Sequence, residues 1–369
     1  MKQRTFYFDL LRLISCFLVV MVHVSGIYFQ TYKVNSLDWL ISNIYNCLAI
    51  IGVPIFFMIS GALLLNPSRE LQIKKFLGHN VVSLLIFYFV TIFAYNVLYF
   101  CISVQDKNFA SFKETVLLKT LCGNGTGVGH LWFLPTLISI YLLVPIIKQG
   151  LTEEKNCIYF CTVFFAVSVL WNSVLFFQIP YYVIFESLKQ VIPFYLFSTY
   201  AGYFVSGHYL HAFLIPKIRK NPNISGKGLS VILGIVFIIG LCLTVITNAF
   251  FSMKKETAMT TTNTPFFFGH FLSSTALFLG LGVLFYEKHI SSKYLSVLSE
   301  LTLGIYLIHP AIITFLKEYL GYSLVWKYPV ISIVLVTMLL FSVSLLLVLF
   351  IRLIRYFFTF LLSKVEFLT

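Results

Sequence analysis

The stretch FDLLRLISCFLVVMVHVSGIYF, residues 8–29, decides the fold. Asp9, Arg12 and His23 are its only acidic or basic side chains, and most other positions are large and apolar. About 20 such residues span the ~30 Å hydrocarbon layer of a membrane as an α-helix. Because lipid cannot hydrogen-bond backbone N–H and C=O groups, we expect this stretch to be a transmembrane helix.

Apolar runs of similar length recur along the whole chain. Hydrophobic residues make up 59% of the 369 positions and charged residues only 11%, whereas a soluble domain carries about 25% charged residues. The mean hydropathy of +0.92 also argues against a water-soluble protein. We therefore predict an all-α, polytopic membrane bundle that forms a single domain over residues 1–369 and has membrane lipid around it. Its ten expected spans lie near residues 8–29, 40–65, 79–103, 130–148, 157–179, 188–207, 229–251, 265–286, 297–317 and 329–358.

The basic residues predict how the bundle is oriented. With ten spans both termini lie on one side, and that side carries the larger share of the 26 Lys and Arg residues. Loops rich in Lys and Arg stay in the cytoplasm, so both termini are expected inside the cell, in a multi-pass cell-membrane protein. The net charge of +13 then follows mostly from topology and implies no nucleic-acid partner. The basic loop 208–228 has the same explanation, or it binds an anionic cofactor at the cytoplasmic mouth.

The first span carries the densest set of ionisable groups. Arg12 and His23 are eleven residues apart, and at ~100° per residue they project from one face, ~16 Å apart along the axis. Asp9 precedes Arg12 by three residues and can pair with it. Such groups are costly in hydrocarbon, so each suggests a function. The alternatives are that Arg12 snorkels to the surface and that His23 is a hydrogen-bonded packing residue.

Two other spans carry polar side chains of interest. His130 and Trp132 open the fourth span from the outside, where Trp132 alone would be an ordinary interfacial anchor. Tyr306 and His309 lie deep in the ninth span, three residues apart and hence on one face. Internal hydrogen bonds at a proline kink would explain this second pair equally well.

These residue types favour group transfer across the membrane. A histidine can take a proton from a hydroxyl near neutral pH, and an arginine can hold a phosphate but does not exchange protons. An arginine at the inner end and a base farther out fit a cytoplasmic donor and an extracytoplasmic acceptor, with His130 and Trp132 near the acceptor. We find no metal-ligand spacing and expect no metal.

Four motifs in a fixed order carry a family resemblance. They are the R-x10-H pair of Arg12 and His23, then FFMISGALL at 56–64, HLWFLP at 130–135 and GIYLIHP at 304–310. Together they resemble the acyltransferase type-3 family of membrane acyltransferases, in particular the surface-polysaccharide O-acetyltransferases. The resemblance covers nearly the whole chain and includes the ten-helix plan.

The resemblance implies transfer of an acyl group, usually acetyl from acetyl-CoA as co-substrate, to a hydroxyl of an extracytoplasmic or lipid-linked glycan. It implies an essential role for His23 and a role for Arg12 in handling the acyl-CoA donor. Ser60 and Gly61 match the family's Ser-Gly motif, although Ala62 replaces its aromatic residue. With Asp9 beside Arg12, these residues form the predicted catalytic and donor-binding set, and Tyr306, His309, His130 and Trp132 the predicted orienting set.

One motif of the family is missing. Many members carry an R-x-x-R pair where the third span begins, but residues 74–83 read KKFLGHNVVS. Either Lys74, Lys75 or His79 replaces the lost charge in donor binding, or the donor binds differently. A transporter or flippase for a lipid-linked sugar or an anionic solute is the main alternative function, and a sensor or scaffold with vestigial motifs is a weaker one.

Overall fold

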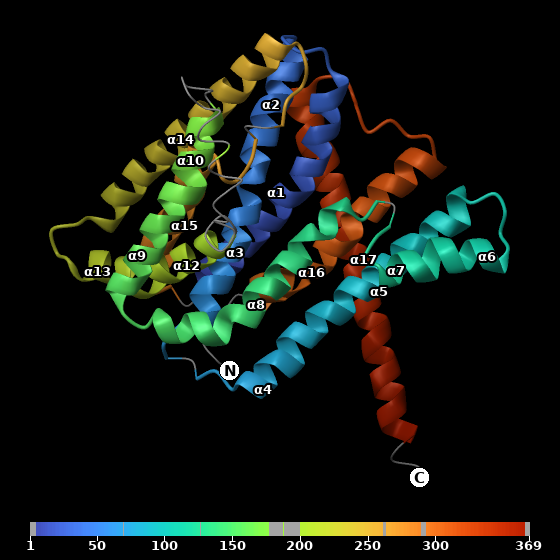
Figure 1. Ribbon diagram of the computed structural model, residues 1–369, viewed down its shortest axis with the longest axis horizontal. Helices are drawn as coiled ribbons and strands as arrows, with labels where there is room; N and C mark the ends of the chain where they lie inside the picture. The colour runs from blue at the N-terminus through green and yellow to red at the C-terminus, as the bar shows by residue number, and fades with distance from the viewer. Residues whose placement is uncertain are drawn as a thin grey trace.

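The chain folds as an all-α bundle in a computed structural model (Figure 1). The structure describes residues 5–68, 70–125, 127–176, 187, 200–260, 263–288 and 293–365. Within these ranges there is no β-strand, and nine helical segments are long and apolar enough to cross a membrane. The protein is therefore a polytopic α-helical membrane protein, as the sequence predicts. The nine segments are Phe6–Thr31, Leu37–Leu64, Ile73–Ser103, Gly129–Gly150, Glu154–Leu175, Gly226–Lys255, Phe268–Phe285, Tyr294–Glu318 and Pro329–Tyr356.

The helices follow the apolar runs closely. Among the described residues, five π-helical segments adjoin the α-helices, at Leu77–Val81, Lys113–Leu118, Phe165–Leu170, Leu210–Leu214 and Phe315–Tyr319. One 3-10 turn, Gly129–Trp132, precedes an α-helix. The α-helices are α1 Phe6–Thr31, α2 Leu37–Ile50, α3 Gly52–Leu64, α4 Ile73–Phe76, α5 Val82–Ser103, α6 Phe109–Phe112, α7 Lys119–Leu121, α8 Phe133–Gly150, α9 Glu154–Phe164, α10 Trp171–Phe176, α12 Ala201–Tyr209, α13 Ile215–Lys220, α14 Gly226–Lys255, α15 Phe268–Phe285, α16 Lys293–Thr314 and α17 Pro329–Val365.

Two predicted spans need comment. The sixth, 188–207, lies mostly outside the described residues, and its last part is the helix α12. The second, 40–65, is two helices that meet at Ile51. Pro54 has no N–H to donate to Ile50, so the ladder breaks there. Gly52 lets α3 start against α1, since a Cβ on Gly52 would lie 2.7 Å from the carbonyl oxygen of Ser15.

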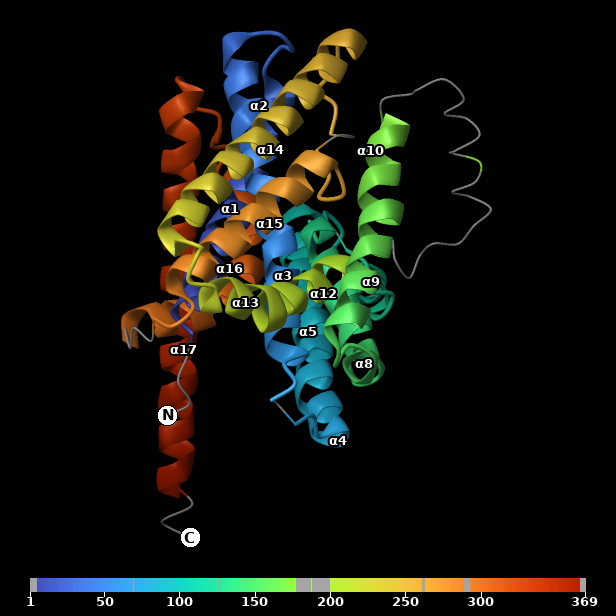
Figure 2. The same ribbon diagram turned by 90° about the vertical axis from the view of Figure 1, so that its left-hand side faces the viewer.

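The first helix lies inside the bundle. It packs against α2, α3, α16 and α17, which lie around it in Figure 1. In Figure 2 the start of α1 and the end of α17 lie toward the same end of the bundle. This arrangement agrees with two termini on one side of the membrane. The face of α1 that carries Arg12 and His23 is thus enclosed by protein rather than turned to lipid.

Two glycines bring α3 and α12 into backbone contact. A Cβ on Gly61 would lie 1.7 Å from the carbonyl oxygen of Phe204, and one on Gly207 would lie 2.0 Å from that of Met58. Only a hydrogen fits at either position, and small residues are a common means of close helix packing in membranes. Gly61, the glycine of the Ser60-Gly61 pair, therefore lies at the point where α3 and α12 cross.

The carboxyl end of α3 is held by a side chain from another span. The last carbonyl groups of a helix have no partner within the helix. Lys148, in the last turn of α8, donates from Nζ to the carbonyl oxygens of Leu64 and Asn66, at 3.3 and 2.8 Å. This contact fixes the end of α3 relative to α8, and both helices contribute to the site described next.

Candidate functional site

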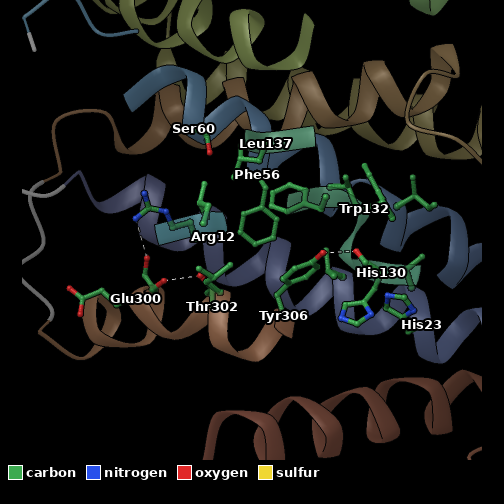
Figure 3. A pocket seen from close by; sticks show the side chains of 18 of the residues that line it. Arg12, His23, Phe56, Ser60, His130, Trp132, Leu137, Glu300, Thr302 and Tyr306 are labelled. Atoms are coloured by element: carbon green, nitrogen blue, oxygen red, sulfur yellow. Dashed lines mark hydrogen bonds between the residues drawn. The ribbon is translucent and has the colours of Figure 1, made fainter. Parts of the chain in front are cut away.

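A cavity of about 500 Å³ lies between α1, α3, α5, α8 and α16. Arg12 and His23 both line it, so the predicted common face of α1 is confirmed. Figure 3 shows Arg12, Ser60 and Glu300 gathered at one end and His23 and His130 at the other. Its walls are formed by Arg12, Val19, Val22, His23, Ile50, Val53, Phe56, Ser60, Leu84, His130, Trp132, Phe133, Leu137, Tyr141, Ser299, Glu300, Thr302, Leu303 and Tyr306.

At the first end, Arg12 is held by groups from two helices. Its Nη1 lies 3.4 Å from the Asp9 carboxylate and 3.5 Å from Ser299 Oγ on α16. Ser299 also donates to Asp9 at 2.8 Å, and Ser296 donates to the other carboxylate oxygen at 3.3 Å. The predicted pairing of Asp9 with Arg12 is confirmed. Asp9 is only 4% exposed, so its carboxylate acts here by orienting the guanidinium group.

The same end carries other polar groups. Ser60 faces the cavity from α3, opposite Glu300 and Thr302 on α16 (Figure 3). Glu300 forms an ion pair with Arg352 of α17, at 3.2 Å. Serine and threonine hydroxyls accept and donate hydrogen bonds, and a guanidinium group donates in a planar fork. This end therefore offers an anion both charge and hydrogen bonds.

Three imidazole rings form a triangle at the second end. The centroid of the His23 ring lies 5.1 Å from that of His309 and 6.3 Å from that of His130. His130 and His309 are 6.0 Å apart. These residues come from α1, from the turn before α8 and from α16, so the fold unites side chains that the sequence separates widely. His23 and His130 line the cavity, and His309 lies behind them, fully buried.

Backbone carbonyl groups fix the tautomers of two of these rings. His130 Nδ1 lies 3.2 Å from the carbonyl oxygen of Gly127, and His309 Nδ1 lies 3.1 Å from that of Ile305. Because a carbonyl oxygen only accepts, Nδ1 carries the proton in each neutral ring and Nε2 keeps a lone pair. Within the described part of the chain, neither Nε2 atom has a hydrogen-bond partner. The cluster thus holds two buried nitrogen atoms ready to accept a proton or a hydrogen bond.

Two tyrosines support this cluster. Tyr306 donates from its hydroxyl to the carbonyl oxygen of His130 at 2.5 Å, which Figure 3 shows as a dashed line. Tyr95 packs its ring 5.4 Å from His130 and donates to the carbonyl oxygen of Leu307 at 3.0 Å. Sequence reasoning missed Tyr95, which is one of several aromatic residues in its span. It ties α5 to α16 across the cluster.

Between the two ends the cavity is apolar. Phe56 and Leu137 line this part, and Trp132 borders it near the histidines (Figure 3). The Trp132 ring packs 5.2 Å from that of Tyr200 and remains 43% exposed. Apolar walls keep water away from reacting groups and strengthen the electrostatic interactions of any bound group.

The remaining predicted donor-binding residues lie outside the cavity. Lys74 and Lys75 are exposed on the short helix α4, and His79 is exposed just after it. In the basic 208–228 segment, Lys217 pairs with Glu154 at 3.5 Å and Arg219 with Glu287 at 2.7 Å. None of these seven residues lines the cavity. Over the residues that the structure describes, no group of three or more His, Cys, Asp or Glu side chains is placed to hold a metal ion.

Fold and site together define a class: a polytopic membrane protein with an internal cavity that has an arginine at one end and imidazole groups at the other. The model of the acyltransferase type-3 family, described as an acyltransferase domain, matches residues 5–353. The chain belongs to this family and is a membrane acyltransferase. Searches of curated proteins and of solved structures each gave no match.

Proposed function

We propose that this protein transfers an acetyl group from cytoplasmic acetyl-CoA to a hydroxyl of an extracytoplasmic or lipid-linked glycan, in the cell membrane. One observation carries the proposal: a single cavity joins the Arg12 end to the His23 end. A reaction with a donor on one side and an acceptor on the other needs such a path.

In this proposal the donor enters from the Arg12 end. The guanidinium group of Arg12 binds a phosphate of CoA, because its planar fork matches phosphate oxygens. Ser60 and Ser299 add hydrogen bonds from opposite walls. Lys74 and Lys75, exposed at the start of the third span, attract the phosphates before they enter. The flexible pantetheine arm then crosses the apolar middle and brings the thioester to His23, ~16 Å along the helix axis.

At the imidazole end His23 acts as the general base. It takes the proton of the acceptor hydroxyl, the oxygen attacks the thioester carbonyl, and the C–S bond breaks. The proton on the imidazolium then passes to the CoA thiolate, so the products are an ester and free CoA. In the second form of this mechanism His23 attacks the thioester carbonyl, the C–S bond breaks and the CoA thiolate leaves. The hydroxyl oxygen then attacks the acetyl-imidazole, the C–N bond breaks and the hydroxyl proton ends on the CoA thiolate, so the products are again an ester and free CoA.

The neighbouring residues orient this chemistry. The lone pair on Nε2 of His130 or His309 accepts a hydrogen bond from the ring of His23 or from the acceptor hydroxyl. Tyr306 keeps the His130 backbone in place through its hydroxyl. The partly exposed Trp132 offers a flat apolar ring against which a sugar can pack.

The direct test measures acyl-CoA consumption by purified protein with His23→Ala and Arg12→Lys. We expect His23→Ala to lose activity and Arg12→Lys to need more donor. His270→Gln is the control, because His270 is a buried histidine that donates to the Cys47 carbonyl and lies outside the cavity. Full activity of His23→Ala would refute the role given to His23.

A transporter or flippase for a lipid-linked sugar or an anionic solute is the competing function, since a polar path through a bundle would serve it too. The mass of the glycan distinguishes the two. Acylation adds one acetyl mass per modified hydroxyl, whereas transport leaves the mass unchanged and alters only the side of the membrane. An unmodified glycan that changes sides in reconstituted vesicles would favour the transporter.

A further inference from the structure

A second hollow lies on the lipid-facing side of α1, outside the reaction cavity. It is a groove of about 370 Å³ between α1, α16 and α17. Its lining is apolar throughout and includes Leu13 and Phe17 of α1, Leu298 and Ile305 of α16, and Phe341 and Leu345 of α17. None of these side chains lines the reaction cavity, so the two hollows occupy different faces of α1.

The groove has an aromatic wall and is open to the membrane. The rings of Phe17 and Phe341 meet edge to face, with centroids 5.8 Å apart. Phe17, Phe341 and Leu345 are each only partly buried, so they present apolar surface to whatever fills the groove. In hydrocarbon such a hollow takes an acyl chain rather than water, because water would find no polar partner there.

Positive charge lies just beyond one end of the groove. Arg352 follows Leu345 by seven residues on α17, which is about two turns and ~10 Å farther along the same face. Its side chain is half exposed and pairs with Glu300, two residues after Leu298 of the groove. Arg355, which is also exposed, lies three residues farther along α17 and is a second basic side chain at this end.

We propose that this groove binds one anionic phospholipid, with an acyl chain against Leu13, Phe17 and Phe341 and the phosphate on Arg352. Arginine binds phosphate through two parallel hydrogen bonds, and basic residues beside a span attract anionic headgroups. Arg352 keeps donors available while paired, since Glu300 occupies one of its two terminal nitrogens in the ion pair. The proposal is independent of the reaction proposed above.

The test is native mass spectrometry of the full chain purified in detergent, with phosphatidylglycerol or phosphatidylcholine added at equal concentration. We expect one phospholipid per protein and a preference for phosphatidylglycerol of about fivefold. Leu345→Trp fills the groove and should remove the adduct. Leu346→Trp is the matched control, because Leu346 is 65% exposed on α17 and lies outside the groove.

Two charge variants should act in opposite directions without filling the groove. Arg352→Gln should abolish the preference for phosphatidylglycerol, and Glu300→Gln should increase it by leaving Arg352 to the phosphate. These variants keep the proposal testable if Leu345→Trp does not fold.

Three results would overturn the proposal. They are an absent one-to-one adduct in the wild-type protein, equal retention in Leu345→Trp, or equal binding of the two lipids. A wild-type dimer that Leu345→Trp dissociates would assign the groove to a second copy of the chain instead.

Discussion

At one end of the cavity Arg12 is oriented by Asp9 and Ser299, whereas at the other end the Nε2 atoms of His130 and His309 find no hydrogen-bond partner among the described residues. The first arrangement holds a charge in place, and a held charge suits binding. The second leaves nitrogen lone pairs without partners in a buried site. Unsatisfied buried groups cost free energy of folding, so their presence calls for an explanation such as a catalytic role. The comparison therefore supports the proposed division of the cavity into an anchoring end at Arg12 and a reacting end at the histidines.

The largest effect should come from replacing His23 by glutamine. Glutamine retains a polar side chain of similar reach but cannot take a proton, so kcat should fall by about 10²–10⁴-fold, the usual contribution of a general base. Stopped assays of free CoA release measure this. His270→Gln, the matched buried histidine, should keep its kcat, and a similar fall in both variants would mean that the loss is structural.

A smaller effect of a different kind should follow Arg12→Lys. Lysine keeps the charge but loses the planar fork, and charge-assisted hydrogen bonds contribute about 1.5–3 kcal/mol. KM for acetyl-CoA should then rise by about tenfold or more while kcat changes little. Steady-state kinetics over a range of donor concentrations tests this. A fall in kcat at unchanged KM would place Arg12 in the chemical step and remove the distinction between the two ends.

Gly61→Ala should lower the stability of the whole bundle rather than change one end of the cavity alone. The added methyl group would meet the Phe204 carbonyl and force α3 and α12 apart, and overpacking of this kind costs about 1–3 kcal/mol. Thermal unfolding in detergent should show a lower Tm. Gly78→Ala is the control, because nothing lies within 4 Å of a Cβ there. If both variants unfold at the wild-type temperature, the close crossing is not required.

Asp9→Asn should have the smallest effect. The amide oxygen can accept the hydrogen bond of one of the two serines, Ser296 or Ser299, and the NH2 group can donate to the hydroxyl of the other, but the charge opposite Arg12 is lost. The contact is long, at 3.4 Å, and the Arg12 side chain is 28% exposed and also bonded to Ser299. The loss should therefore be close to the ~1 kcal/mol of an exposed ion pair although Asp9 is buried, and KM for the donor should change by no more than about fivefold. A loss of kcat as large as that of His23→Gln would instead make Asp9 a participant in the reaction.

Much of this architecture follows from the sequence because the signals are local. Apolar runs predict spans, and the eleven-residue spacing predicts that Arg12 and His23 share a face, since helical geometry alone determines both. The pairing of Asp9 with Arg12 is local in the same sense. The break between α2 and α3 has a local cause in Pro54, although its position was not predicted.

The arrangement of the three histidines could not be predicted from the sequence, because it depends on the tertiary structure. Nothing in the spacing of His23, His130 and His309 places their rings together, because three helices from distant parts of the chain must pack first. Tyr306 and His309 share a helical face, yet only Tyr306 lines the cavity and His309 lies behind His23. Tyr95 had no distinguishing signal among the aromatic residues of its span.

The contact of Lys148 with the end of α3 has a consequence for biogenesis. The carbonyl groups of Leu64 and Asn66 leave the ribosome long before the residue that caps them. Until the fourth span enters the membrane, this helix end has to rely on water or headgroups, so α3 is completed only after insertion of a later segment. Replacing Lys148 should therefore slow maturation of the nascent chain, even where the assembled bundle tolerates the change.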